Sequence, residues 1–151
     1  MADQAMLIRR GQVPSLNVMG AGVQFLCDSD ATGGAWSLME VLLPKHSGPP
    51  PHDHDWDEAY YVLSGEVSFS INEQLHSVSA GDFVYAPGGT VLSFHGLSDQ
   101  PARVLIFDAP GHAGSFFKEV DQQVKRLPDD LSKVPGIGER HGVRFKMPKA
   151  A

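Results

Sequence analysis

The sequence predicts an all-β fold, a small antiparallel double-sheet β-barrel with one or two short C-terminal helices. Between about residues 20 and 110, short segments rich in Val, Phe, Tyr, Leu and Ile are separated by Gly, Pro, Asn and Asp at intervals of about ten residues. That spacing is typical of a sandwich or a barrel. After Pro110 the apolar residues recur at helical spacing instead. The length of 151 residues fits a single domain, which we assign to residues 1–151.

The predicted strands are bounded by residues that favour turns. Ser64–Gly65 and residues 80–82 (Ala-Gly-Asp) tolerate turn dihedral angles, and Asn72–Glu73 is expected at a hairpin tip. Apolar and polar residues alternate along several segments, which predicts one inward and one outward face. The eight predicted strands are Val23–Asp28, Trp36–Leu43, Glu58–Leu63, Glu66–Ile71, Leu75–Ser79, Phe83–Ala86, Val91–His95 and Ala102–Phe107.

Two helices are expected after the strands. Apolar residues between 116 and 124 predict a helix of about three turns that ends near Leu127–Pro128. A second short helix is expected within 130–141, where Pro135 and the neighbouring glycines weaken it or delay its start. Because these pieces are too small to form a core of their own, we expect them to pack on the barrel or on a partner subunit.

Composition and charge exclude several classes of function. Twelve basic and eighteen acidic residues give a formal charge of −6, the wrong sign for a protein that binds a phosphate backbone. No stretch approaches about 18 consecutive apolar residues, and the N-terminus shows no apolar signal region followed by a cleavage site. We therefore expect a cytoplasmic protein that binds neither nucleic acid nor membrane.

A cluster of candidate metal ligands follows a proline run. His52 and His54 are separated by one residue, so both imidazoles point to the same face of an extended strand. After a turn, Glu58 begins the next strand, where its carboxylate can face the same centre. Two histidines and one carboxylate suit Fe(II), and the same set can bind Mn, Ni, Co or Zn. The alternative is a set of polar loop residues, because HDHDWDE is strongly hydrophilic.

Two ordered motifs surround these residues. Gly48–Pro51 fixes an extended backbone before His52, and the order H-x-H-x3-E-x6-G then ends at Gly65. The segment GDFVYAPGG, residues 81–89, begins a second pattern of the form G-x5-P-x-G-x2-H-x3-N. On these motifs, residues of about 35–110 resemble the cupin superfamily.

The tail over about 112–145 (GHAGSFFKEV … GIGERHGVRF) is similar to the ending of quercetinase-like single-domain cupins. The resemblance implies a jelly-roll barrel with one metal ion inside, bound by the two histidines, the glutamate and a second-motif histidine. It further implies a dioxygenase that acts on an enolic or aromatic molecule. A homodimer is also implied, with strand edges or the segment Met1–Gly20 in contact between subunits.

The sequence departs from the cupin pattern at three positions. Leu92 stands where the second-motif histidine is expected, so the fourth ligand is missing. Gly96 replaces the second-motif asparagine, and His46 replaces the first-motif glycine. His95 could substitute for the missing histidine only if a β-bulge turned it inward, because its strand parity is opposite to that of Leu92. Either the remaining triad keeps a divalent transition metal, or the cavity no longer needs one.

These residues define two functional hypotheses. In the first, Glu58 is both a metal ligand and the catalytic base, and Tyr60, Leu92 and Phe94 form the substrate-binding wall inside the barrel. In the second, the protein is a non-catalytic cupin that binds a small molecule in a degenerate or empty site. A sensor domain of a transcription regulator is disfavoured, because the chain leaves no room for a helix-turn-helix and is acidic.

Overall fold

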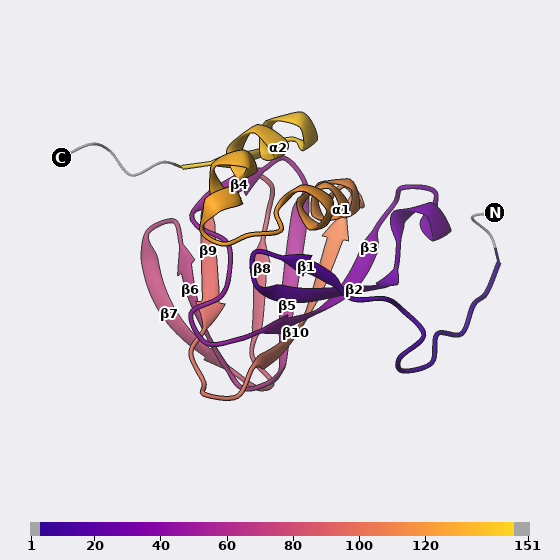
Figure 1. The fold of residues 1–151 in the computed structure, drawn as a ribbon. Helices are drawn as coiled ribbons and strands as arrows, with labels where there is room; N and C mark the ends of the chain where they lie inside the picture. Colours follow the sequence, from indigo (N-terminus) through magenta and orange to yellow (C-terminus); the bar gives the residue numbers. More distant parts are fainter. Residues whose placement is uncertain (1–3, 147–151) are drawn as a thin grey trace.

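The structure, a computed structural model that describes residues 4–146, consists of two antiparallel sheets facing each other (Figure 1). One sheet has six strands in the order β1-β2-β3-β10-β5-β8, and the other has five in the order β11-β4-β9-β6-β7. The predicted all-β double-sheet fold is therefore confirmed. The strands are β1 (Leu16–Val18), β2 (Ala21–Cys27), β3 (Ser37–Leu43), β4 (His52–His54), β5 (Asp57–Ser64), β6 (Glu66–Ile71), β7 (Gln74–Ser79), β8 (Phe83–Ala86), β9 (Leu92–Gly96), β10 (Ala102–Ala109) and β11 (Val143–Phe145).

All eight predicted strands are present, with ends shifted by at most two residues. His52–His54 form the short strand β4. This is the extended conformation that the spacing of the two histidines predicts. Two further strands, β1 and β11, were not predicted. Each has three residues, too few for an alternating pattern, and each exists because a neighbouring strand supplies its hydrogen bonds.

The two predicted helices are also present. Helix α1 (Ala113–Gln123) covers most of the expected apolar segment, but it ends four residues before the predicted Leu127 because Val124 is extended. The second begins as a 3-10 turn, η2 (Asp129–Lys133), and becomes α2 (Val134–His141). Pro135 lies in the first turn of α2, where its missing N–H is not needed, so it delays the helix without breaking it. A further 3-10 turn, η1 (Ser29–Thr32), links β2 to β3. No helix among residues 4–146 is both long and apolar enough to span a membrane.

The core between the sheets contains a cluster of aromatic rings. The ring of Tyr60 lies 5.1 Å from that of Phe69 and 5.3 Å from that of Phe94, both edge-on. Phe69 and Phe94 stack on each other at 5.2 Å. All three side chains are buried. Such pairs add to the stabilisation that burial alone provides, and here they fix the inner face of β5 beside the candidate site.

The C-terminal segment closes one end of the barrel, where α1, α2 and β4 lie together (Figure 1). Strand β11 pairs antiparallel with β4, so that Val143 faces His54 and Phe145 faces His52. Arg144, between them, binds the carboxylates of Asp53 and Asp55. The expectation that the tail packs on the β body is therefore correct, and the tail holds the histidine strand in place.

The loop before β4 depends on a close backbone approach at Gly48. Its φ is +152°, and a Cβ added there would lie 1.8 Å from the carbonyl oxygen of Phe94. His46, at the position of the first-motif glycine, keeps a left-handed φ of 69°. The backbone at His46 therefore keeps the left-handed conformation that glycine adopts easily, although the residue carries a larger side chain.

Replacing Gly48 with alanine should destabilise the fold by about 3 kcal/mol, because the Cβ overlaps the Phe94 carbonyl and φ is strained. Gly81→Ala is the matched control: φ is +91° there, but no atom lies within 4 Å of the added Cβ. The control should lose only about 1 kcal/mol. Urea unfolding of both variants checks this, and equal losses would contradict the close approach.

Candidate metal centre

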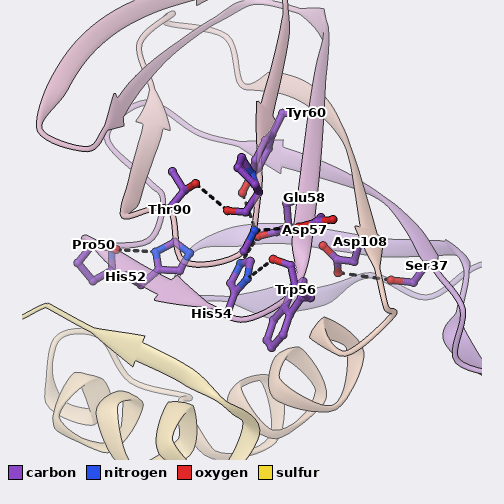
Figure 2. A network of polar contacts seen from close by, with 12 residues as sticks. Ser37, Pro50, His52, His54, Trp56, Asp57, Glu58, Tyr60, Thr90 and Asp108 are labelled. Atoms are coloured by element: carbon purple, nitrogen blue, oxygen red, sulfur yellow. Dashed lines mark hydrogen bonds and ion pairs between the residues drawn. The ribbon is translucent and has the colours of Figure 1, made fainter.

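The three predicted ligands come together between β4 and β5. Ligand atoms of His52, His54 and Glu58 all lie within 4.8 Å of one another, and all three side chains are buried. Both imidazoles lie on one side of β4, and the carboxylate of Glu58 approaches from the start of β5 (Figure 2). The short strand β4 and the start of the longer strand β5, joined by a tight turn, therefore deliver the whole set.

Hydrogen bonds to the backbone orient both imidazoles. His52 Nδ1 lies 2.9 Å from the carbonyl oxygen of Pro50, and His54 Nδ1 lies 3.0 Å from that of Trp56 (Figure 2). Since a carbonyl oxygen only accepts, each Nδ1 carries the proton and each Nε2 keeps a free lone pair. Metal-binding histidines have this arrangement, because the backbone bond fixes the ring and the tautomer.

The free Nε2 of His54 contacts Oε1 of Glu58, which also accepts a hydrogen bond of 3.0 Å from the hydroxyl of Tyr60. A lone pair on nitrogen and a carboxylate oxygen repel at this separation unless a proton or a cation lies between them. A divalent metal meets that requirement and gains a third ligand from His52. The donor set therefore fits a metal ion.

Burial keeps both histidines neutral. Desolvation lowers the pKa of His52 from 6.5 to about 4, and it lowers the pKa of His54 in the same direction. A neutral imidazole is the form that binds metal, so no proton has to leave these rings near pH 7. For Glu58, burial raises the pKa, which makes its carboxylate a stronger proton acceptor than an exposed one.

A second buried carboxyl, Asp108, was not identified from the sequence. Antiparallel register places Glu58 opposite Asp108 and Asp108 opposite Ser37, so the three residues form one row across β5, β10 and β3. Asp108 is fully buried, and the Ser37 hydroxyl donates to its Oδ2 at 3.4 Å. The sequence did contain a signal that Asp108 faces inward, because Asp108 continues the alternation of the inward-facing residues Val104 and Ile106.

Burial and the neighbouring Glu58 carboxylate raise the pKa of Asp108 well above its usual range. Its Oδ1 has no donor among the described residues. A carboxyl group in that position is stable when it carries the proton itself and gives it to an acceptor, and Glu58 is the adjacent acceptor. The row therefore places two carboxyl groups side by side in a buried environment that favours the protonated form of Asp108.

The site opens into a cavity of about 60 Å³ with mostly apolar walls. Tyr60 and Phe94 line it, as do aliphatic residues of the six-stranded sheet. Trp56, whose ring stacks on His54 at 4.0 Å, is a buried wall residue. The polar side-chain atoms of the lining residues include those of the triad, the Tyr60 hydroxyl and Trp56 Nε1, which is buried with no hydrogen-bond partner among the described residues.

The remaining predicted residues lie close by but outside the triad. Leu92 is buried directly opposite His52 without lining the cavity, so its contact with substrate stays a prediction. His95 pairs with Ser68, and β9 has no bulge that would turn it inward. Within residues 4–146, the clustered metal-ligand groups are therefore His52, His54 and Glu58.

In the metal-free protein, His52 should destabilise the fold in acid. Below pH 6.5 the His52 ring is protonated in the unfolded chain, whereas in the folded protein the buried ring, with a pKa of about 4, stays neutral until about pH 4. The contribution of the neutral ring to the free energy of unfolding is fully present above pH 6.5 and is lost as the pH falls toward 4. The loss is about 3 kcal/mol, because each unit of pKa difference corresponds to about 1.36 kcal/mol.

Urea unfolding in chelator, for wild type and His52→Gln, isolates this effect because the other titrating groups are common to both proteins. The free energy of unfolding of the wild type, minus that of the variant, should fall by about 3 kcal/mol between pH 7 and pH 4. A difference that does not change with pH would contradict the buried neutral ring.

Comparison with known proteins identifies the fold. Residues 38–108 match the family model of the cupin domain. An uncharacterized protein of Streptomyces coelicolor is 28% identical over 91 residues, which are 60% of this chain and 82% of that protein. The polyketide cyclase RemF from Streptomyces resistomycificus superposes with a TM-score of 0.62 at 20% identity, over 70% of this chain and 80% of RemF. For a predicted oxalate decarboxylase from Thermotoga maritima the TM-score is 0.63 at 23% identity, over 70% and 99% of the two chains.

The matched segment, residues 38–108, is thus similar to the cupin domain and contains the buried His-His-Glu cluster. The resemblance seen in the sequence motifs is confirmed. A likeness at such low identity shows a shared fold and does not establish a reaction, so the activity has to be argued from the site itself.

Proposed function

We propose that this protein is a mononuclear metal enzyme, a quercetinase-like dioxygenase that acts on an enolic or phenolic molecule. The observation that carries the proposal is the triad: three oriented ligand groups face a mostly apolar cavity. Open coordination positions within an apolar pocket are what an organic substrate and dioxygen require.

His52, His54 and Glu58 would hold one Fe, Mn, Ni, Co or Zn ion. Such an ion supplies Lewis acidity and, where it is redox-active, electron transfer between substrate and dioxygen. The backbone carbonyls that hold both Nδ1–H groups keep the two imidazoles in place as ligands.

The protein residues supply the acid-base step. Glu58 accepts the proton of the substrate hydroxyl, because it is the carboxylate that lines the cavity beside the two histidines. Tyr60 donates a hydrogen bond of 3.0 Å to Glu58 Oε1 and so fixes the direction from which the proton arrives. The apolar walls exclude water, which would otherwise compete for Glu58 and for the substrate anion.

The alternative function is a non-catalytic cupin that binds a small molecule. The observation that favours it is Leu92, which fills the position opposite His52 with an apolar side chain in place of a fourth ligand. The names of the two structural neighbours, a cyclase and a predicted decarboxylase, show that a shared barrel does not select between these possibilities.

Elemental analysis of the purified protein, prepared without chelator, tests the metal site. We expect about one equivalent of a transition metal in the wild type, and its loss in the His52→Ala His54→Ala double variant. His76→Ala His95→Ala is the matched control, since both of these histidines lie outside the cluster. No metal in the wild type, even after reconstitution with Fe(II), Mn(II), Ni(II) and Zn(II), would overturn the enzyme proposal.

With metal present, dioxygen consumption distinguishes the enzyme from the binder. The metal-loaded wild type should consume dioxygen with flavonols or simpler enols, and the double-histidine variant should not. Stoichiometric metal without consumption across both substrate classes would favour the non-catalytic alternative.

We also propose that the protein is a homodimer that uses the outer face of the six-stranded sheet. Tyr61, Phe83 and Tyr85 are exposed by 44%, 63% and 57% on this face, and Phe83 is the cross-strand neighbour of Tyr61. The charged residues of β3 and β10 here, Glu40 and Arg103, neutralise each other at 2.8 Å. Chains that each carry a charge of −6 meet most easily through such a neutral apolar face. The contacts expected through strand edges or through Met1–Gly20 stay predictions, and residues 1–3 of that segment lie outside the described range.

Light scattering after gel filtration tests this proposal. The wild type should have twice the chain mass, and Phe83→Arg should shift it to the monomer. Leu75→Arg is the control, because Leu75 is exposed by 74% on β7 of the other sheet. A monomeric wild type, or equal masses for both variants, would contradict the proposed face.

A further inference from the structure

A second pocket lies outside the barrel, on the outer face of the six-stranded sheet. It measures about 510 Å³ and is bounded by the N-terminal segment 8–15 on one side and by β2, β3 and β10 on the other. A pocket of this volume accommodates a small organic molecule. Its lining shares no residue with the cavity at the triad, so the two spaces are separate.

Hydrogen bonds fix the N-terminal wall of this pocket. The N–H of Gln12 donates to the carbonyl oxygen of Arg9 at 3.1 Å, and the N–H of Arg9 donates to Oε1 of Gln12 at 2.6 Å. Gly11, at the third position of this turn, has a φ of +84°, which glycine adopts without strain. Farther along, the side chain of Gln24 donates to the carbonyl oxygen of Val13 at 3.1 Å. The turn is therefore tied to β2 in a defined conformation.

Positive charge dominates the lining of the pocket, although the whole chain carries a charge of −6. Three arginines, Arg9, Arg10 and Arg103, line it together with one carboxylate, Glu40. Glu40 is paired with Arg103. Arg9 and Arg10 form no ion pair with a carboxylate of residues 4–146. Two positive charges therefore remain uncompensated in the pocket.

The guanidinium of Arg103 is held in place and still has donors to offer. Its contact with Glu40 uses Nε and Nη2, while Nη1 forms no hydrogen bond within the described part of the chain. A guanidinium has five N–H donors, so Nη1 can bind an oxygen of a second acid while the pair with Glu40 persists.

The floor beside these charges is apolar. Arg103 lies opposite Leu42 in the register of β10 and β3, and Leu42 is exposed by 45%. Leu26 and Ile8 extend the apolar lining on either side. A ligand that joins an acidic group to an apolar body would cover this surface and place its acid at the guanidinium groups. An inorganic anion would leave the leucines in water.

We propose that this pocket binds an amphipathic organic acid, a small molecule with a carboxylate or phosphate group attached to an apolar body. The acidic group binds Arg9, Arg10 and Nη1 of Arg103, and the apolar body lies on Leu26 and Leu42. The site takes no part in the metal chemistry and does not depend on the proposed function. It also uses other strands than the aromatic residues of β5 and β8 that we assign to the dimer contact.

Isothermal titration calorimetry with naphthyl phosphate and naphthoate tests the pocket, with naphthalenemethanol as the uncharged probe. The wild type should bind at least one of the acids, one molecule per chain, and bind the alcohol at least about tenfold more weakly. Arg9→Gln Arg10→Gln should weaken binding of the acid by at least about tenfold, because both uncompensated charges are removed. Lys125→Gln Arg126→Gln removes the same charge outside the pocket and should bind as the wild type does.

All four substituted side chains are exposed, so these variants should fold as the wild type does. The tighter of the two acids identifies the acidic group that the pocket prefers. Equal affinities for acid and alcohol would overturn the proposal, and so would a wild type that binds neither acid at millimolar concentration. Equal affinities of the two double variants would overturn it as well, because binding would then depend on the net charge of the chain or on another site.

Discussion

The contact between His54 and Glu58 is the constraint on which the rest of the site depends, because the surrounding structure has to hold these two groups together. Two electron-rich atoms, an imidazole nitrogen and a carboxylate oxygen, point at one place in a buried site. Holding them there requires backbone bonds to both rings, a hydroxyl from Tyr60, and a cation or proton at the centre. The strained loop at Gly48 and the pairing of β11 with β4 fix the strand that carries the histidines.

Much of this arrangement could be predicted from the sequence, because period-two alternation and the spacing of His52, His54 and Glu58 are local signals. Parity along β5 and β9 also predicted that Tyr60 and Phe94 face inward. What could not be predicted depends on contacts between distant segments. Asp108 lies fifty residues after Glu58, and only the register of β10 against β5 makes them neighbours. Likewise, β11 is a strand only because β4 is beside it.

Leu92 and Asp108 together describe how this site differs from a four-ligand cupin. The wall opposite His52 has lost a ligand and become apolar, while the wall opposite Glu58 holds an additional buried carboxyl. Polarity is therefore concentrated on the β5 and β10 side, next to the residue that we propose as base. Phe94 extends the apolar lining of the cavity on the β9 side, away from these carboxyl groups.

X-ray absorption spectroscopy of the metal-loaded protein tests the central claim most directly, because it counts the imidazoles bound to the ion. The account predicts two imidazole nitrogens and one carboxylate, with the remaining positions taken by water oxygen. Three imidazoles would show that another histidine, such as His95, completes the site and that the three-ligand account is wrong. A spectrum without imidazole would show that the ion binds elsewhere.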